Sequence, residues 1–234
     1  MVQKTEETAY LLHATPYRET SLIVDLFTRE TGRIAAVAKG ARRRNSVLRA
    51  VLLQFQPLAV SYFGRQELRN LAGAEWLGGQ VAPQGDALIC AFYMNELLVR
   101  LLPREDPHAT LFDGYAQALA RLTAGEAIDD TLRRFEWLLL REAGYAPDLE
   151  RDAANRPIQA GASYQWRPAG GFVAAEPAAD STVSGSTLRE IAAGRFDSTA
   201  SRLQAKYLTR TILAHHLDGY PLNTRQILID LQKL

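Results

Sequence analysis

A run of cations between residues 39 and 49 carries the clearest chemical signal in this chain. The segment reads KGARRRNSVLR, and its cations are Lys39, Arg42, Arg43, Arg44 and Arg49. A guanidinium group binds phosphate through two parallel hydrogen bonds, and several such contacts give affinity that does not depend on base sequence. The run therefore predicts contact with the phosphates of a nucleic acid strand, and the alternative is a solvated, mobile loop.

The acids that would neutralise these cations are missing from the surrounding sequence. The chain has 26 acids in 234 residues, a density that would place four in a segment of 36, yet residues 31–66 hold none. Residues 1–80 carry 11 Lys+Arg and 7 Asp+Glu, a net of +4, while residues 81–234 carry 16 and 19, a net of −3. A patch of one sign attracts polyanions by its local field, although the formal net charge is only +1.

Other residues of the first part of the chain could extend this cationic surface. Three further arginines could lengthen the phosphate path, or could equally serve a structural role: Arg33, Arg65 and Arg69. Four aromatic residues could stack on bases, as on single-strand binding platforms: Tyr17, Phe55, Tyr62 and Phe63. Most aromatic residues on barrel strands lie in the core, so we expect one or two of the four to stack at most.

The residue types that carry catalysis or bind metals form no recognisable group. The four histidines, His13, His108, His215 and His216, lack a metal-binding spacing. The sequence contains no phosphate-binding P-loop, no GxGxxG and no GxSxG. Cys90 lies in an apolar run typical of a helix in a protein core. We therefore expect a protein that is not an enzyme and holds no metal or cofactor.

Composition and the chain start indicate a cytoplasmic protein without membrane contact. A single cysteine cannot form an internal disulfide, so no oxidising compartment is implied. The first ten residues, MVQKTEETAY, lack the apolar core of a signal peptide. The apolar run near residues 87–102 is interrupted by Asn95, Glu96 and Arg100, which is typical of a buried helix. If it binds DNA, we expect it to associate with the nucleoid.

The elements that position the basic run are predicted to be strands. Apolar alternation, interrupted by turn residues, indicates strands near residues 10–13, 22–27, 33–38, 58–63 and 68–74. Five short strands with a long basic loop between the third and the fourth suit a small closed barrel. The OB-fold is a five-stranded barrel of this kind that binds single strands. A small barrel of the SH3 type fits the periodicity almost as well.

Beyond Pro83 and Gly85 the pattern becomes helical. We expect one helix capped by Asp106 with Pro107 at its first position, and another capped by Asp129 or Asp130 and closed by Gly144. The predicted helical ranges are 86–102, 106 onward, 129–143, 186–193, 199–217 and 224–233, with a hairpin formed by residues 164–167 and 172–175. We thus predict an α+β chain with an OB-fold domain over residues 1–80 and a helical domain over residues 81–234, which carries a small β insert at about 146–183.

Several segments together resemble the RecO family of bacterial recombination mediators. They are YRETS at 17–21, GR at 32–33, VAKGAR at 37–42, LLQFQPL at 52–58, GRQEL at 64–68, YMNELL at 93–98, LRRFE at 132–136 and GY at 144–145. The resemblance runs from about residue 7 to residue 145, and more weakly to the end through GYPL at 219–222. The order and spacing of the segments make it specific.

This resemblance implies a function as well as a fold. It implies binding to single- and double-stranded DNA, annealing of complementary strands, and loading of the RecA recombinase onto DNA coated by single-strand binding protein, together with RecR and sometimes RecF. The resemblance also implies that the single-strand binding protein inserts its acidic, Phe-ended tail into a groove of the helical domain. Arg133 or Arg134 is expected to bind that carboxylate, with Arg133 the better match, and one of the two could instead pair with Glu136 or Glu142.

The insert departs from the family pattern. Many family members carry four zinc-binding cysteines there, whereas this chain has Asp152 and Asn155 about where the first pair would lie, and Ala174 to Ala178 around the second. Without thiolates we expect no zinc, and an insert held by packing alone. Two other functions stay open from the residues: a protein-binding adaptor with incidental DNA contact, and an RNA-binding OB protein.

Overall fold

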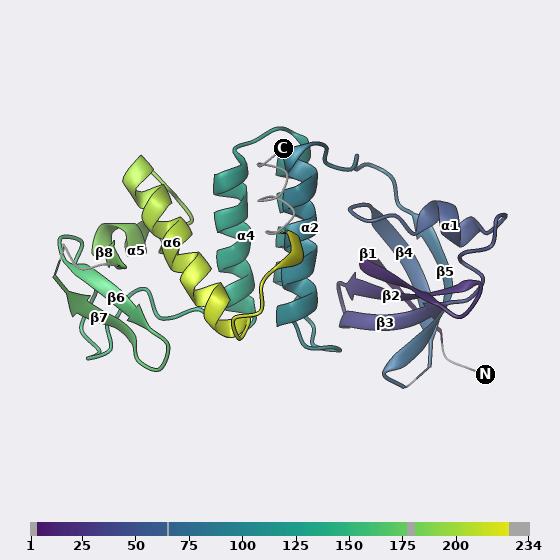
Figure 1. Ribbon diagram of the computed structural model, residues 1–234, viewed down its shortest axis with the longest axis horizontal. Coiled ribbons are helices and arrows are strands. Elements are labelled where there is room, and N and C mark those ends of the chain that lie inside the picture. Colours follow the sequence, from purple (N-terminus) through teal and green to yellow (C-terminus); the bar gives the residue numbers. More distant parts are fainter. Residues whose placement is uncertain (1–3, 65, 177–180, 225–234) are drawn as a thin grey trace. The chain divides into compact units, whose positions relative to one another are not determined.

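The computed structural model describes residues 4–64, 66–176 and 181–224 (Figure 1). Arg65 and the helix predicted over 224–233, beyond its first residue, lie outside the described residues. The chain divides into two compact units. The first comprises residues 1–126 with 222–234, and the second comprises residues 127–221. The predicted boundary between residues 80 and 81 falls inside the first unit.

The first unit is built on a closed barrel, in which the five predicted strands are confirmed. They are β1 (Thr5–Tyr17), β2 (Ser21–Thr28), β3 (Gly32–Ala38), β4 (Pro57–Phe63) and β5 (Leu68–Trp76). Their order around the barrel is β1-β2-β3-β5-β4, and β3 pairs with β5 in parallel while the other pairs are antiparallel. This arrangement is the OB-fold, so the alternative SH3 type of barrel is excluded.

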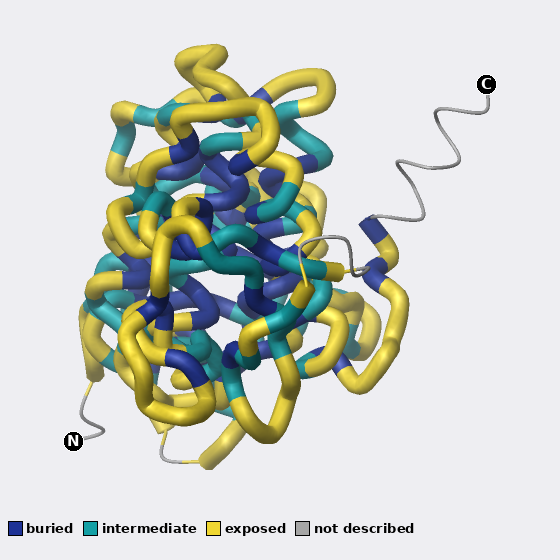
Figure 2. The backbone as a smooth tube through the Cα atoms, turned by 90° about the vertical axis from the view of Figure 1, so that its left-hand side faces the viewer, coloured by how far each residue is buried: buried dark blue, intermediate teal, exposed yellow. Residues whose placement is uncertain are grey.

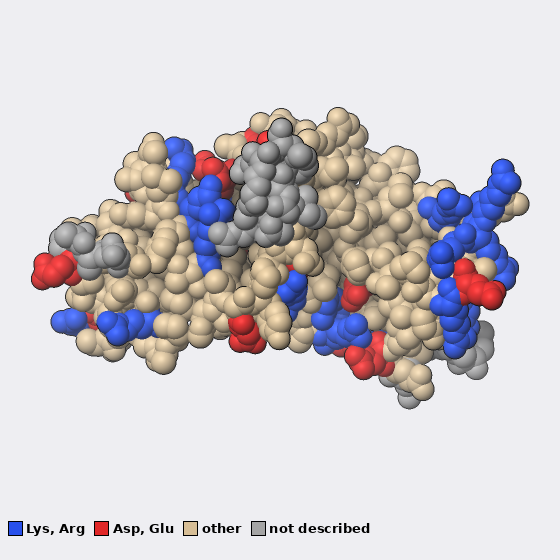
Figure 3. All heavy atoms as spheres, viewed as in Figure 1, with Lys and Arg blue, Asp and Glu red and all other residues tan. Residues whose placement is uncertain are grey.

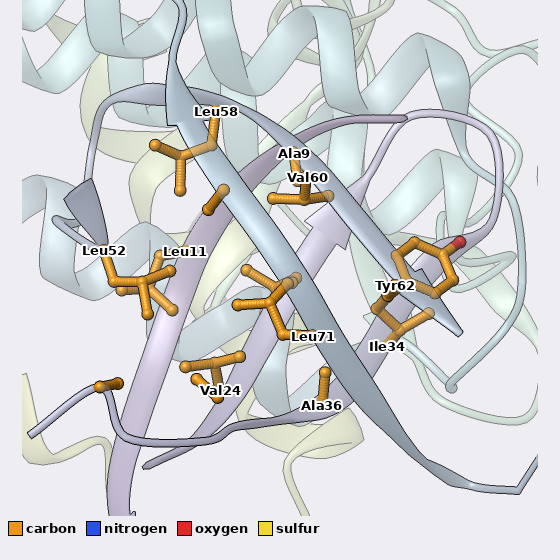
Figure 4. Close-up of a cluster of buried hydrophobic side chains, with 14 residues drawn as sticks. Ala9, Leu11, Val24, Ile34, Ala36, Leu52, Leu58, Val60, Tyr62 and Leu71 are labelled. Atoms are coloured by element: carbon orange, nitrogen blue, oxygen red, sulfur yellow. The ribbon is translucent and has the colours of Figure 1, made fainter. Parts of the chain in front are cut away.

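Alternate residues of the strands fill the barrel (Figure 4). Val24 and Val60 are at most 1% exposed, and Tyr62 is fully buried. Successive side chains of a strand point to opposite faces, so the period-two pattern of the sequence places one apolar set inside. The other set points outward, where the strand surface has room for helices or a ligand.

One element between β3 and β4 was not predicted from the sequence. The short helix α1 (Val47–Val51) follows the arginine run, and Leu48 and Val51 pack against the barrel core. Val47 on the same helix is 74% exposed. The second half of the predicted basic loop is therefore a helical turn anchored on the barrel, and not a free loop.

Two helices of the first unit pack against the outside of the barrel. They are α2 (Asp86–Leu101) and α3 (Ala109–Thr123). Tyr10 and Phe27, on the outward faces of β1 and β2, lie 5.3 and 5.4 Å from the ring of Phe112, and 5.1 and 6.4 Å from that of Tyr115. This aromatic cluster fixes α3 on the barrel, because each ring buries a large apolar area.

The predicted start of α3 at Asp106 and Pro107 was wrong. The helix begins at Ala109, because the residues before it pair with the barrel. The backbone N–H of Glu105 donates to the carbonyl of Arg33 at 2.9 Å. A side chain at Gly32 (φ 81°) would lie 2.0 Å from the carbonyl oxygen of Asp106. This close approach requires glycine, so the Thr31-Gly32 turn seats the α2–α3 connection as well as reversing the chain.

The second unit contains helices and a small sheet. Its elements are α4 (Ile128–Glu142), β6 (Ser163–Arg167), β7 (Gly171–Ala175), β8 (Thr182–Ser184), α5 (Gly185–Ala192) and α6 (Thr199–His216). The predicted hairpin is confirmed, and β8 adds a third strand that was not predicted. In both units the buried residues follow helices and strands, while connections are mostly exposed (Figure 2).

The predicted N-cap of α4 was also wrong, whereas its predicted closure by Gly144 (φ 75°) is confirmed. The N-cap is Ala127, and Asp129 and Asp130 lie in the first turn. Asp129 accepts a hydrogen bond from Lys206 at 3.0 Å, and Asp130 one from Arg202 at 3.2 Å. The two carboxylates join α4 to α6 while they also face the positive end of the α4 dipole. The hydrogen bond from Lys206 lowers the pKa of Asp129.

The insert is held by more than packing. Tyr164 and Phe172 pack inside it, at 3% and 0% exposed. Asp152 adds a polar centre: its Oδ1 accepts from the backbone N–H groups of Ala154 and Arg156, both at 2.9 Å, and its Oδ2 lies 2.8 Å from the Arg156 guanidinium. A carboxylate at this position thus organises the turn.

Candidate nucleic-acid interface

The arginine run is anchored to the barrel at its first residues. Ala41 is 1% exposed and belongs to the barrel core. The backbone N–H of Arg42 donates to the carbonyl of Thr20 at 2.9 Å, and its guanidinium lies 3.3 Å from the carbonyls of Arg18 and Glu19. These bonds join the run to the turn between β1 and β2. The local order comes from the backbone and from the side chain of Arg42, and the neighbouring cations stay accessible to a ligand.

The cations of the run face solvent. Lys39, Arg42, Arg43, Arg44 and Arg49 are all exposed. Within the described residues, the charged groups of the five have no acid within ion-pair distance. Lys and Arg side chains gather at this end of the barrel, over α1 and the adjoining turns, with a few acidic atoms among them (Figure 3). Uncompensated cations on a fixed backbone are suited to phosphate groups.

One further cation joins this surface that sequence reasoning missed. Arg18 is exposed in the β1–β2 turn (φ 51°), and its guanidinium lies 5.1 Å from the centre of the Tyr17 ring. Its backbone carbonyl accepts from Arg42, so it lies beside the run. The signal that could have found it is its position in the first turn, since the loop between strands 1 and 2 of an OB-fold contacts oligonucleotides.

Arg33 does not extend the cationic surface. Its side chain is 13% exposed, its Nη1 donates to the carbonyl of Val99 at 2.5 Å, and it lies 3.9 Å from Asp25. Burial lowers its pKa, and the nearby carboxylate of Asp25 opposes that effect. The predicted phosphate contact of Arg33 therefore needs correction: Arg33 takes the structural role that the sequence had left equally open, and joins the barrel to α2. Sequence could not show this, because the partner carbonyl lies 66 residues away.

Arg69 is also engaged within the protein. Its side chain is 15% exposed, its Nη2 lies 2.8 Å from Glu105, and its guanidinium lies 5.0 Å from the centre of the Tyr62 ring. Phosphate binding by this arginine would compete with Glu105. Arg65, the neighbouring predicted contact, lies outside the described residues.

The helices explain why the basic surface is confined to one end of the barrel. On the outward face of β2 and β3, Phe27 and Ala35 are at most 1% exposed, and the α2–α3 connection lies along β3. An OB-fold commonly binds oligonucleotides on its strand 2–3 face. Part of that face is covered in this protein, whereas the turn at Arg18 and the run at residues 39–49 stay accessible.

Two of the four candidate stacking residues are excluded by burial. Phe55 is 2% exposed and Tyr62 is fully buried. Tyr62 also donates to Glu7, which accepts from Thr31 as well. Burial raises the pKa of Tyr62 to about 12, with the hydrogen bond to Glu7 acting in the same direction. Tyr17 and Phe63 are half-buried, so they remain candidates for stacking on bases.

The two candidate contacts for a partner's tail differ in exposure. Arg133 is 4% exposed, and its Nη2 lies 2.6 Å from Glu136 on the same helix, which is the structural alternative raised from the sequence. Arg134 is exposed, because successive residues of a helix face about 100° apart. Of the two, Arg134 is the one that reaches solvent.

The described residues contain no group of three or more His, Cys, Asp or Glu side chains placed to hold a metal ion. No helix among them combines the length and the apolar character needed to cross a membrane.

Comparisons with known proteins match nearly the whole chain. The model of the family "Recombination protein O N terminal" matches residues 1–80, and that of "Recombination protein O C terminal" matches residues 82–226. A relative named DNA repair protein RecO from Ralstonia nicotianae is 47% identical, over 98% of this chain and 86% of the relative. Proteins of the same name from Burkholderia pseudomallei and an Azoarcus species are 49% and 44% identical, again over 98% of this chain and over 84% and 97% of the relatives.

Proposed function

Because the chain belongs to the RecO family of DNA repair proteins, we propose that it acts as a non-enzymatic recombination mediator in the cytoplasm. In this proposal it binds single- and double-stranded DNA and anneals complementary strands. It also helps to load RecA onto DNA coated by single-strand binding protein. A role in recombinational DNA repair follows from the family, while annealing and loading are the finer parts of the proposal.

One observation supports DNA binding most directly. Five exposed cations of the run, joined by Arg18, occupy one end of an OB-fold barrel without an ion-pair partner among the described residues. Such a surface neutralises phosphates without reading bases, because backbone contacts carry no sequence information. A protein that anneals arbitrary complementary strands requires this kind of sequence-independent contact.

The proposed partners follow from the family. They are RecR, the acidic tail of single-strand binding protein and, in some settings, RecF. For the tail we propose Arg134 as the carboxylate contact, since its side chain is exposed, whereas Arg133 is paired with Glu136 within α4. An exposed arginine forms a charge-assisted hydrogen bond with a carboxylate at low desolvation cost.

A strand-annealing assay tests the proposal. Two complementary oligonucleotides are mixed with the protein, in the presence and absence of single-strand binding protein, and duplex formation is followed by fluorescence. We expect acceleration in both conditions, and loss of acceleration when Arg42, Arg43 and Arg44 are replaced together by Ala. A protein that binds these strands but never accelerates pairing would contradict the annealing role.

Two measurements separate this function from its rivals. A protein-binding adaptor with incidental DNA contact would show weak DNA binding with little salt dependence, whereas phosphate contacts give a steep one. An RNA-binding OB protein would prefer RNA when DNA and RNA strands of equal length compete. We expect steep salt dependence and no preference for RNA, because the exposed contacts of the run address phosphates.

A further inference from the structure

A cavity of about 780 Å³ opens beside α1 in the first unit. Its walls come from residues 11–14 of β1, residues 52–54 directly after α1, and the side of α2 that carries Phe92, Asn95 and Glu96. Cavities of this size accept ligands as large as a drug molecule or a few nucleobases. The proposed function leaves this space unused.

The cavity is continuous in the chain with the basic run. Arg49 lies in α1, and Leu53, which lines the cavity, follows the end of that helix. Val47 and Ala50 are both exposed and three residues apart, so they share one face of α1. Leu53 is 48% exposed just beyond them. An apolar strip thus leads from the cations to the cavity.

Phe92 gives the cavity a fixed aromatic ring. It is 39% exposed, although most apolar residues of α2 are buried. The buried ring of Phe55 meets it edge-on, with 4.9 Å between ring centres and 82° between the planes. Phe55 itself has φ 67°, a backbone conformation that an aromatic residue rarely adopts. A partly exposed ring held by a second ring is a stacking surface that loses little freedom on binding.

The polar groups of the cavity do not repel a polyanion. Its acid, Glu96, lies 2.9 Å from Arg100 and accepts from the backbone N–H groups of Asn223 and Thr224 at 2.9 and 3.0 Å. Burial would raise the pKa of Glu96, but these hydrogen bonds outweigh it and lower the pKa. The amides of Gln54 and Asn95 both donate to the carbonyl of Leu12. The charge of the wall is therefore balanced, and the neighbouring charge is positive.

We propose that this cavity receives unstacked nucleobases of the strand whose phosphates the basic run holds. The inference rests on the proposed function, because the phosphate contacts bring the strand to the cavity. The apolar side chains of a protein partner are the other occupant that such a wall could take. The adjoining cations, which have no ion-pair partner among the residues that the structure describes, favour nucleic acid, since a strand offers phosphates and flat apolar rings at a regular spacing.

Abasic DNA separates base contacts from phosphate contacts. The probes are a labelled thymidine oligomer of about 15 nucleotides and an abasic oligomer of equal length, measured by fluorescence anisotropy. We expect Phe92→Ala to weaken thymidine binding roughly five- to a hundredfold, the range for loss of one stacked base. The affinity of the same variant for the abasic oligomer should stay at the wild-type value. Phe92→Leu, which keeps the packing against Phe55, should show the same pattern more weakly.

Trp76→Ala is the matched control. Trp76 is an aromatic residue of the same unit, 56% exposed, that does not line the cavity, so both affinities should stay at the wild-type value. A wild-type cross-linking experiment with 4-thiothymidine oligomers needs no variant, and adducts should map to residues 11–14, 52–54 or 92–100.

The possible outcomes distinguish this inference from the proposed function. An unchanged ratio of thymidine to abasic affinity in Phe92→Ala, or adducts confined to other segments, overturns the nucleobase cavity and leaves phosphate binding in place. If Phe92→Ala loses binding to an acidic, Phe-ended peptide but keeps the wild-type affinity for DNA, the cavity belongs to a protein partner, and the inference is also overturned. If neither oligomer responds to replacement of Arg42, Arg43 and Arg44, the proposed function itself fails.

Discussion

Arg133 is buried and its neighbour Arg134 on α4 is exposed, so their replacement should change stability by very different amounts. Arg133→Ala leaves the buried carboxylate of Glu136 without its 2.6 Å partner, so we expect a loss of about 3–5 kcal/mol in the free energy of unfolding. Arg134→Ala should change stability by less than about 0.5 kcal/mol, as exposed positions usually do. Chemical denaturation of both variants measures the difference.

The same pair tests the contact with the partner's tail. Arg134→Ala should weaken binding to an acidic, Phe-ended peptide by about 1–3 kcal/mol, the range for loss of a charge-assisted hydrogen bond. Binding to naked DNA should stay constant. If Arg134→Ala binds the peptide as the wild type does, while Arg133→Ala keeps its stability but loses the peptide, then the roles assigned to the two arginines are reversed.

Glu7 should make the stability of the barrel depend on pH in the acid range. Burial would raise its pKa, but hydrogen bonds from Thr31 and Tyr62 outweigh burial and hold the pKa below its ordinary value of 4.5. A lowered folded-state pKa contributes stability that is complete above pH 4.5 and is lost as pH falls through the folded value. Glu7→Gln should therefore lose about 1 kcal/mol at neutral pH, since the carboxylate is only half-buried.

The measurement is the free energy of unfolding of wild type and Glu7→Gln across a pH series. The two curves should converge as pH falls below 4.5, because the wild type loses its advantage there. Parallel curves over the whole series would show that Glu7 does not titrate differently in the folded protein.

At the scale of elements, the insert should depend on Asp152 and not on zinc. Asp152→Ala removes the acceptor of two backbone N–H groups and the partner of Arg156, so the melting temperature should fall. Asp152→Asn keeps an acceptor oxygen, so its melting temperature should fall less. Chelators should leave the wild-type melting temperature unchanged, and elemental analysis should find no stoichiometric zinc. One zinc per chain would contradict this account of the insert.

The strands were predictable because each rests on local alternation and turn residues, as at Thr31-Gly32. The elements that failed depend on distant partners. The start of α3 is displaced by pairing of Glu105 with Arg33, and β8 forms by pairing with β6. Helix α1 is only five residues long and is stabilised by packing on the barrel, which local propensity does not report.

The residues of the candidate site also divide into those that local sequence predicts and those whose role depends on distant partners. The missing acids of residues 31–66 predicted the exposed run, because charge composition needs no tertiary information. The role of Arg33 depends on a carbonyl of α2, and that of Arg133 on burial of α4. Neither could be predicted from residue type and spacing.

At the scale of the whole molecule, the central claim is that the basic run carries sequence-independent DNA binding. If four or five of its cations each neutralise one phosphate, log affinity for single-stranded DNA should fall with log salt at a slope of roughly −3, at about −0.7 per contact. When Arg42, Arg43 and Arg44 are replaced together by Ala, the loss of affinity should be similar for every DNA sequence, since phosphates carry no base information.

The decisive measurement is this slope for the wild type and for the protein with Arg42, Arg43 and Arg44 replaced together by Ala. The control replaces Arg134, Arg195 and Arg210, three exposed arginines of the other unit, which changes the net charge equally. We predict that the first variant reduces the slope by roughly 2 on the same coefficient, and that the control keeps the wild-type slope. A first variant with the wild-type slope would contradict the account and place the DNA contact elsewhere on the protein.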